Sequence, residues 1–104
     1  MTIEEAQHTV DKWIRETGKG YFDPVTNVAV LAEETGELAH ILLRRYGQQK
    51  PKATDDLSDI RLADELADVL WVTLALANQT GVNLTEALHA NLDKKQTRDA
   101  GRFR

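Results

Sequence analysis

The chain has 104 residues, of which 41% are hydrophobic and 29% are charged. This length and composition predict one globular domain, residues 1–104, rather than a disordered or fibrous chain. The absence of cysteine excludes disulfides, thiolate metal sites and cysteine nucleophiles. The net charge of −4 argues against a protein that binds duplex nucleic acid by covering its phosphates with basic side chains.

The N-terminal sequence MTIEEAQH is acidic and lacks the basic and apolar regions of a signal peptide. No apolar run in the chain reaches the length that is needed to span a membrane. We therefore expect a cytoplasmic protein that has no membrane partner.

Four segments with helical periodicity are separated by residues that favour turns. The starts of these segments carry residues typical of helix N-caps, namely Thr2, Asp23, Ser58 or Asp59, and Asn83. Glu5 and Glu86 follow the first and last of these caps at the spacing of a capping box. The sequence predicts an all-α fold of the four-helix bundle type, with helices at about residues 3–17, 24–46, 58–80 and 84–98.

The second and third predicted helices both place acidic residues among residues that they must bury. On a projection of about 100° per residue, Glu34 lies inside the apolar arc of the second helix, and Glu37 lies about 60° away at its border. Glu33 is farther from the arc. The third helix repeats this arrangement, with Glu65 inside the apolar arc and Asp68 at its border.

A carboxylate in a protein core must become neutral or find a partner. Only Glu65 has a basic residue four positions away, Arg61. Converging oxygen ligands with little local counter-charge suit a hard divalent cation, so the pattern predicts a Mg²⁺ site that Mn²⁺ could also occupy. The predicted metal ligands are Glu34, Glu37, Glu65 and Asp68. The alternatives are two solvated acidic faces, or a salt network with Arg44, Arg45, Lys50 or Arg61.

The segments EETGE (33–37) and ELAD (65–68) resemble the EExxE and ExxD motifs of the MazG-like all-α nucleotide pyrophosphohydrolases. The resemblance covers about residues 25–98 and implies a single MazG-like domain. It implies that Glu34, Glu37, Glu65 and Asp68 hold Mg²⁺, and Glu33 matches the first glutamate of the family motif. The implied activity is hydrolysis of (deoxy)nucleoside triphosphates to the monophosphate and pyrophosphate, often as house-cleaning of surplus or non-standard nucleotides.

The segment NLDKKQTR (91–98) resembles the phosphate-binding Asn-x-x-Lys and the following arginine of the same family. This likeness implies that Asn91, Lys94 and Arg98 contact substrate phosphates, with Lys95 as a neighbour that could serve instead. The alternative is a solvated basic end of a helix, which the helix dipole favours.

The catalytic hypothesis assigns the metal to activation of a water molecule that attacks the α–β phosphate linkage. Glu33 or Glu37 accepts the proton of this water, and the sequence favours neither. The aromatic candidates for stacking on the nucleobase are Trp13, Tyr21, Phe22, Tyr46 and Trp71, although packing is the commoner role of such residues. His8, His40 and His89 share no ligand spacing and are assigned no role.

The two central helices are apolar over about half of their circumference, which is more than a surface helix needs. We therefore expect a homodimer or a homotetramer, which the family resemblance also implies. Two other functions stay open: a phosphoribosyl-ATP pyrophosphohydrolase of histidine synthesis, and a non-catalytic helical module that binds nucleotide or metal.

Overall fold

The structure, a computed structural model, describes residues 1–99, which form helices and contain no β-strand. The helices are α1 (Ile3–Glu16), α2 (Pro24–Tyr46), α3 (Asp59–Thr80) and α4 (Leu84–Lys94), and a π-helical turn, η1 (Lys95–Asp99), follows α4. The all-α prediction is confirmed. None of these helices is long and apolar enough to cross a membrane.

The predicted N-caps are present at all four helices. In the capping box of α1, the Thr2 hydroxyl accepts a 3.0 Å hydrogen bond from the Glu5 N–H, and Glu5 Oε1 accepts one of 3.0 Å from the Thr2 N–H. Ser58, rather than Asp59, is the N-cap of α3. Three of the observed bounds differ slightly from the predicted ones. Helix α1 ends at residue 16 rather than 17, α3 begins at residue 59 rather than 58, and the last helix is α-helical only to residue 94 rather than 98.

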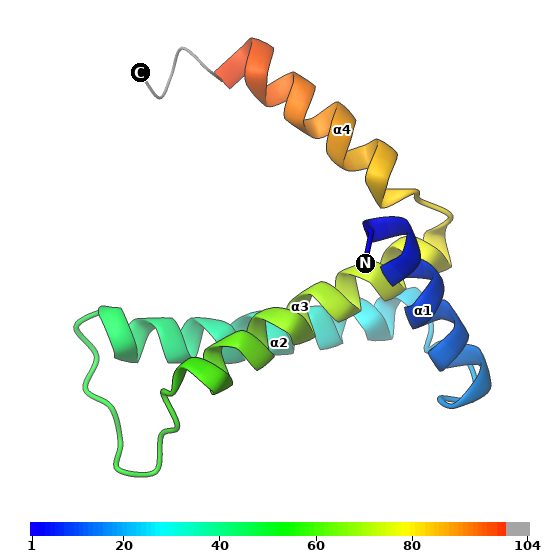
Figure 1. Ribbon diagram of the computed structural model, residues 1–104. Helices are drawn as coiled ribbons and strands as arrows, with labels where there is room; N and C mark the ends of the chain where they lie inside the picture. Colours follow the sequence, from blue (N-terminus) through cyan, green and yellow to red (C-terminus); the bar gives the residue numbers. More distant parts are fainter. Residues whose placement is uncertain (100–104) are drawn as a thin grey trace.

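The long helices α2 and α3 run antiparallel and lie side by side (Figure 1). Helix α1 packs against α3, and the main apolar cluster forms there from Val10 and Ile14 of α1 and Leu74 and Ala75 of α3. Helix α4 packs against α1 near its start and then extends away from the α2–α3 pair (Figure 1). The α2–α3 pair therefore brings side chains of the two longest helices close together.

Gln7 of α1 fixes the connection between α3 and α4. Its Nε2 donates hydrogen bonds to Val82 O at 2.9 Å and to Asn78 Oδ1 at 3.1 Å, and its Oε1 accepts one of 2.9 Å from the Leu84 N–H. Gly81 ends α3 at φ 75°, a conformation that glycine adopts without strain. These contacts hold the start of α4 against α1.

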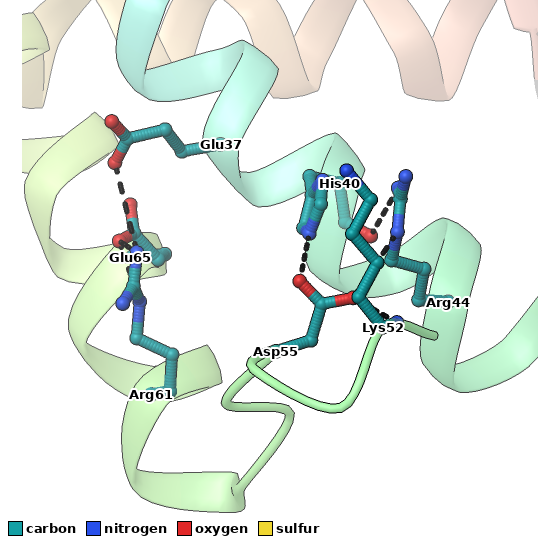
Figure 2. Close-up of polar contacts among 7 residues, drawn as sticks. All are labelled: Glu37, His40, Arg44, Lys52, Asp55, Arg61 and Glu65. Atoms are coloured by element: carbon teal, nitrogen blue, oxygen red, sulfur yellow. Dashed lines mark hydrogen bonds and ion pairs between the residues drawn. The ribbon is translucent and has the colours of Figure 1, made fainter. Parts of the chain in front are cut away.

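Asp55 anchors the loop between α2 and α3. Its Oδ1 lies 2.9 Å from His40 Nε2, and its Oδ2 lies 3.4 Å from Arg44 Nε (Figure 2). The Lys52 N–H also donates a 2.7 Å hydrogen bond to Asp55 Oδ2, and this bond is the main cause that lowers the pKa of Asp55. The loop is thereby tied to the last third of α2, close to the start of α3.

Candidate active site

Helices α2 and α3 bring three of the predicted metal ligands together. Glu34 and Glu37 of α2 and Glu65 of α3 each offer one carboxylate oxygen, and these oxygens lie within 4.8 Å of one another. Glu65 is only 3% exposed, Glu34 is half-buried, and Glu37 is exposed. The three residues, which we call the acidic group, therefore form a site with a closed inner side and an open outer side.

Two oxygens of the acidic group lack any partner. Glu34 Oε2 and Glu65 Oε2 are shielded from solvent, and neither has a hydrogen-bond partner. Leaving a buried carboxylate oxygen unpaired is costly, so such groups are paired with a cation or coordinate a metal. The donor set, which consists of carboxylate oxygens from two helices, fits a hard divalent cation.

The other two predicted acids lie beside the acidic group. Asp68 is half-buried and does not belong to the three converging ligands, but its charge helps to raise the pKa of Glu34. Glu33 is exposed, and its charge contributes to the raised pKa values of Glu34 and Glu37. The ligand role of Asp68 and the catalytic role of Glu33 stay predictions.

Repulsion between carboxylates characterises this site. Burial raises the pKa of Glu34, and the charges of Asp68, Glu37 and Glu65 raise it further. The pKa of Glu37 is raised mainly by the charge of Glu65 and then by burial. Burial is also the main cause that raises the pKa of Asp68. A divalent cation would relieve this repulsion and favour the ionised forms.

One arginine reaches into the acidic group. The Arg61 guanidinium donates a 2.8 Å hydrogen bond from Nε to Glu65 Oε1, and its Nη2 lies 3.9 Å from Glu37 Oε2. Two other arginines near this end of the helix pair, Arg44 and Arg45, form ion pairs with aspartates outside the group. The alternative of a salt network is therefore realised at Glu65 and Glu37 and leaves the buried oxygen of Glu34 unpaired.

An apolar cavity of about 240 Å³ begins one helical turn from the acids. Its lining includes Trp13, Tyr21, Phe22, Asn27, Val30, Trp71 and Val72. Val30 precedes Glu34 by four residues on α2, and Val72 follows Asp68 by four residues on α3. The rings of Trp13 and Trp71 meet edge to face, with centroids 5.8 Å apart. Four of the five aromatic candidates thus share one cavity beside the acids.

The residues predicted to bind phosphate lie on α4 and η1. These residues are Asn91, Lys94, Lys95 and Arg98. Because α4 extends away from the α2–α3 pair (Figure 1), the single chain does not bring this segment to the acidic group. Their substrate role stays a prediction.

Sequence reasoning missed two contacts near the site. The sequence predicts no role for His40, yet its ring binds Asp55 and helps to hold the α2–α3 loop. The pairing of Arg61 with Glu65 follows from their spacing, but its reach across to Glu37 on α2 does not. The signal available in the sequence was the position of His40, three residues after Glu37 and hence on the same side of α2.

The fold and the site define an all-helical protein whose carboxylates converge between two antiparallel helices. The family model of the MazG nucleotide pyrophosphohydrolase domain matches residues 22–103, which include both helices and all five acids. The chain belongs to this family. It is accordingly a hydrolase that acts on nucleotide anhydrides.

The similarity to known proteins extends over almost the whole chain. The uncharacterized protein YpjD of Bacillus subtilis (strain 168) is 40% identical over 102 residues, which are 98% of this chain and 90% of YpjD. The crystal structure of YpjD from Bacillus subtilis, a proposed pyrophosphatase, matches with a TM-score of 0.80 and 37% identity and covers 95% of this chain and 97% of that one. A Bacillus-conserved MazG protein, a nucleotide pyrophosphohydrolase, matches with a TM-score of 0.78 and 33% identity over 97% of this chain and 96% of that one.

The raised pKa of Glu34 predicts a pH-dependent stability of the metal-free protein. The Glu34 carboxyl group binds its proton more tightly in the folded state than in the unfolded state. The contribution of this proton to folding stability is therefore complete below the ordinary glutamate pKa of 4.5, and it is lost as the pH rises through the raised pKa. In buffer with EDTA, Glu34→Gln should therefore raise Tm at pH 8 and change it less at pH 5. Thermal unfolding followed by circular dichroism measures both shifts.

The control for this measurement is Asp93→Asn, which removes an exposed acid of α4 that lies outside the site. Its effect on Tm should be small at both pH values. Equal shifts for Glu34→Gln at pH 5 and pH 8, or destabilisation at pH 8, would show that charge repulsion does not govern the site.

Proposed function

We propose that this protein is a Mg²⁺-dependent nucleoside triphosphate pyrophosphohydrolase. It converts a (deoxy)nucleoside triphosphate and water to the monophosphate and pyrophosphate, and a role in clearing surplus or non-standard nucleotides fits this activity. The observation that carries the proposal is the convergence of Glu34, Glu37 and Glu65, with buried oxygens that lack a partner. Membership of the nucleotide pyrophosphohydrolase family supports it.

The acids have separate roles in this proposal. Glu34, Glu37 and Glu65 hold the divalent ion, and Asp68 completes the set from the next turn of α3. When bound, Mg²⁺ neutralises phosphate charge and lowers the pKa of a water molecule, and Mn²⁺ can replace it. Glu33 and Glu37 are the two candidates for accepting the proton of the attacking water, because both are exposed and lie near the buried acids.

A nucleotide panel tests the activity. With Mg²⁺, at least one nucleoside triphosphate should yield its monophosphate and pyrophosphate, and EDTA should abolish the reaction. Glu37→Gln should lower kcat/KM on the order of a hundredfold, because it removes one of the charges that hold the ion. Circular dichroism should show that the helices are kept. Glu86→Gln, which changes an exposed glutamate of α4, is the matched control.

The same nucleotide panel distinguishes between the alternative functions. It includes phosphoribosyl-ATP, and turnover of that compound alone would identify a phosphoribosyl-ATP pyrophosphohydrolase of histidine synthesis. Metal-dependent binding of a non-hydrolysable nucleotide without turnover of any substrate would instead identify a non-catalytic module. Full activity of Glu37→Gln would contradict the assigned site.

The aromatic cavity is suited to a nucleobase. Its lining combines ring faces with the amide of Asn27, and it begins one turn from the acids, which is a suitable arrangement for a base attached to a metal-bound phosphate chain. The Asn27 side chain is buried and donates a 2.8 Å hydrogen bond to Gln79 Oε1. We infer that the base lies in this cavity and the phosphates lie over the acidic group.

Replacing Trp71 tests this location. Stacking of a base on an aromatic ring contributes about 1–3 kcal/mol, so Trp71→Leu should weaken nucleotide binding roughly tenfold or more. Binding of inorganic tripolyphosphate with Mg²⁺, which has no base, should change little. Isothermal titration calorimetry measures both affinities. Equal losses for the two ligands, or no loss, would place the base elsewhere.

The exposed apolar residues of the central helices support assembly. Both α2 and α3 carry large apolar side chains that are exposed in the single chain, namely Val25, Val28, Leu42, Leu43, Ile60, Leu66 and Leu70. Large apolar side chains that are exposed in a single chain are often covered by a partner, so we infer a homodimer or homotetramer. Such assembly would also give Asn91, Lys94, Lys95 and Arg98 of one subunit a route to the phosphates bound by another.

Light scattering measures the assembly directly. We expect the mass of two or four chains at micromolar concentration. A mass of one chain under these conditions would contradict the assembly and, with it, the shared site.

A further inference from the structure

Arg61 bridges α2 and α3 at the acidic group. It lies in the first turn of α3, one helical turn before Glu65. Its Nη2 is 2.7 Å from Glu65 Oε1 and 3.9 Å from Glu37 Oε2 (Figure 2). The guanidinium therefore neutralises part of the charge of two residues that are assigned above to the metal ion.

The guanidinium and a divalent ion compete for the same carboxylates. Two cations a few ångströms apart repel each other strongly where solvent is partly excluded. The Arg61 side chain is 41% exposed, whereas Glu65 is buried, so the arginine is the group that is free to rotate away. Occupation of the site by metal would then leave a displaced guanidinium at the edge of the acidic group.

The order of residues along the two helices indicates what this guanidinium would meet. Val30 and Val72 line the aromatic cavity, and Glu37 and Glu65 belong to the acidic group. Arg61 lies one helical turn beyond Glu65, on the side of the acidic group that faces away from the cavity. A nucleotide with its base in the cavity and its phosphates over the acids would therefore direct its terminal phosphates toward Arg61.

We propose that Arg61 is a phosphate-binding residue with two states. In the metal-free protein it neutralises Glu65 and Glu37, and in the loaded protein it binds the terminal diphosphate part of the substrate, which leaves as pyrophosphate. The planar guanidinium suits this role because its paired N–H groups match two phosphate oxygens, which a lysine ammonium cannot do. The inference rests on the proposed function.

If Arg61 has these two states, replacing it should change the affinities for Mg²⁺ and for tripolyphosphate in opposite directions. Without nucleotide, Arg61→Met should bind Mg²⁺ roughly tenfold more tightly than the wild type, because the competing cation is gone. With saturating Mg²⁺, the same variant should bind inorganic tripolyphosphate roughly tenfold more weakly. Arg61→Lys keeps the competing charge, so its Mg²⁺ affinity should stay near that of the wild type while tripolyphosphate binding is intermediate.

Isothermal titration calorimetry with each ligand measures these affinities, and circular dichroism checks the fold of each variant. Arg45→Met is the matched control, because Arg45 forms its ion pair with Asp59 at the same end of the helix pair and outside the acidic group. It should change neither affinity by more than about twofold.

The outcomes distinguish this inference from the function on which it rests. Weaker or unchanged Mg²⁺ binding by a folded Arg61→Met variant overturns the inference, even if the wild type hydrolyses nucleotides. Unchanged tripolyphosphate binding overturns it as well. Absence of Mg²⁺ binding by the wild type overturns both the inference and the metal part of the proposed function. Opposite shifts of the two affinities support the inference, whichever nucleotide proves to be the substrate.

Discussion

The repulsion between carboxylates at the contact of α2 and α3 is the constraint on which the site depends. Glu34 and Glu65 each keep an oxygen where neither water nor a hydrogen-bond donor reaches it, and the pKa of Glu34 is raised as a result of burial and neighbouring charge. Among residues 1–99, few apolar side chains are buried and able to offset that cost. Buried charges that destabilise a fold are expected at sites where they bind a ligand.

The antiparallel pairing of α2 and α3 gives the site a direction. The aromatic cavity lies at one end, the acids lie in the middle, and Arg61 with the anchored loop lies at the other end. A nucleoside triphosphate has the same order of an apolar base, a phosphate chain that binds metal, and a terminal anion. The match between these two orders links the fold to the proposed reaction more closely than any single residue does.

The sequence predicts what local rules determine. N-caps such as Thr2 and Ser58 act within one turn of their helices, and an acid inside an apolar arc is visible because it breaks the helical pattern. The reach of Arg61 to Glu37 and the binding of Asp55 by His40 depend on how separate segments meet, which periodicity does not encode. The direction of α4 likewise follows from tertiary contacts.

The most direct measurement is anomalous diffraction at the manganese edge from crystals grown with Mn²⁺. We expect an anomalous peak among the carboxylate oxygens of Glu34, Glu37 and Glu65, with the Arg61 guanidinium moved away from Glu37. A peak elsewhere, or its absence while Arg61 still binds Glu65, would contradict the claim that these acids converge in order to hold a divalent ion.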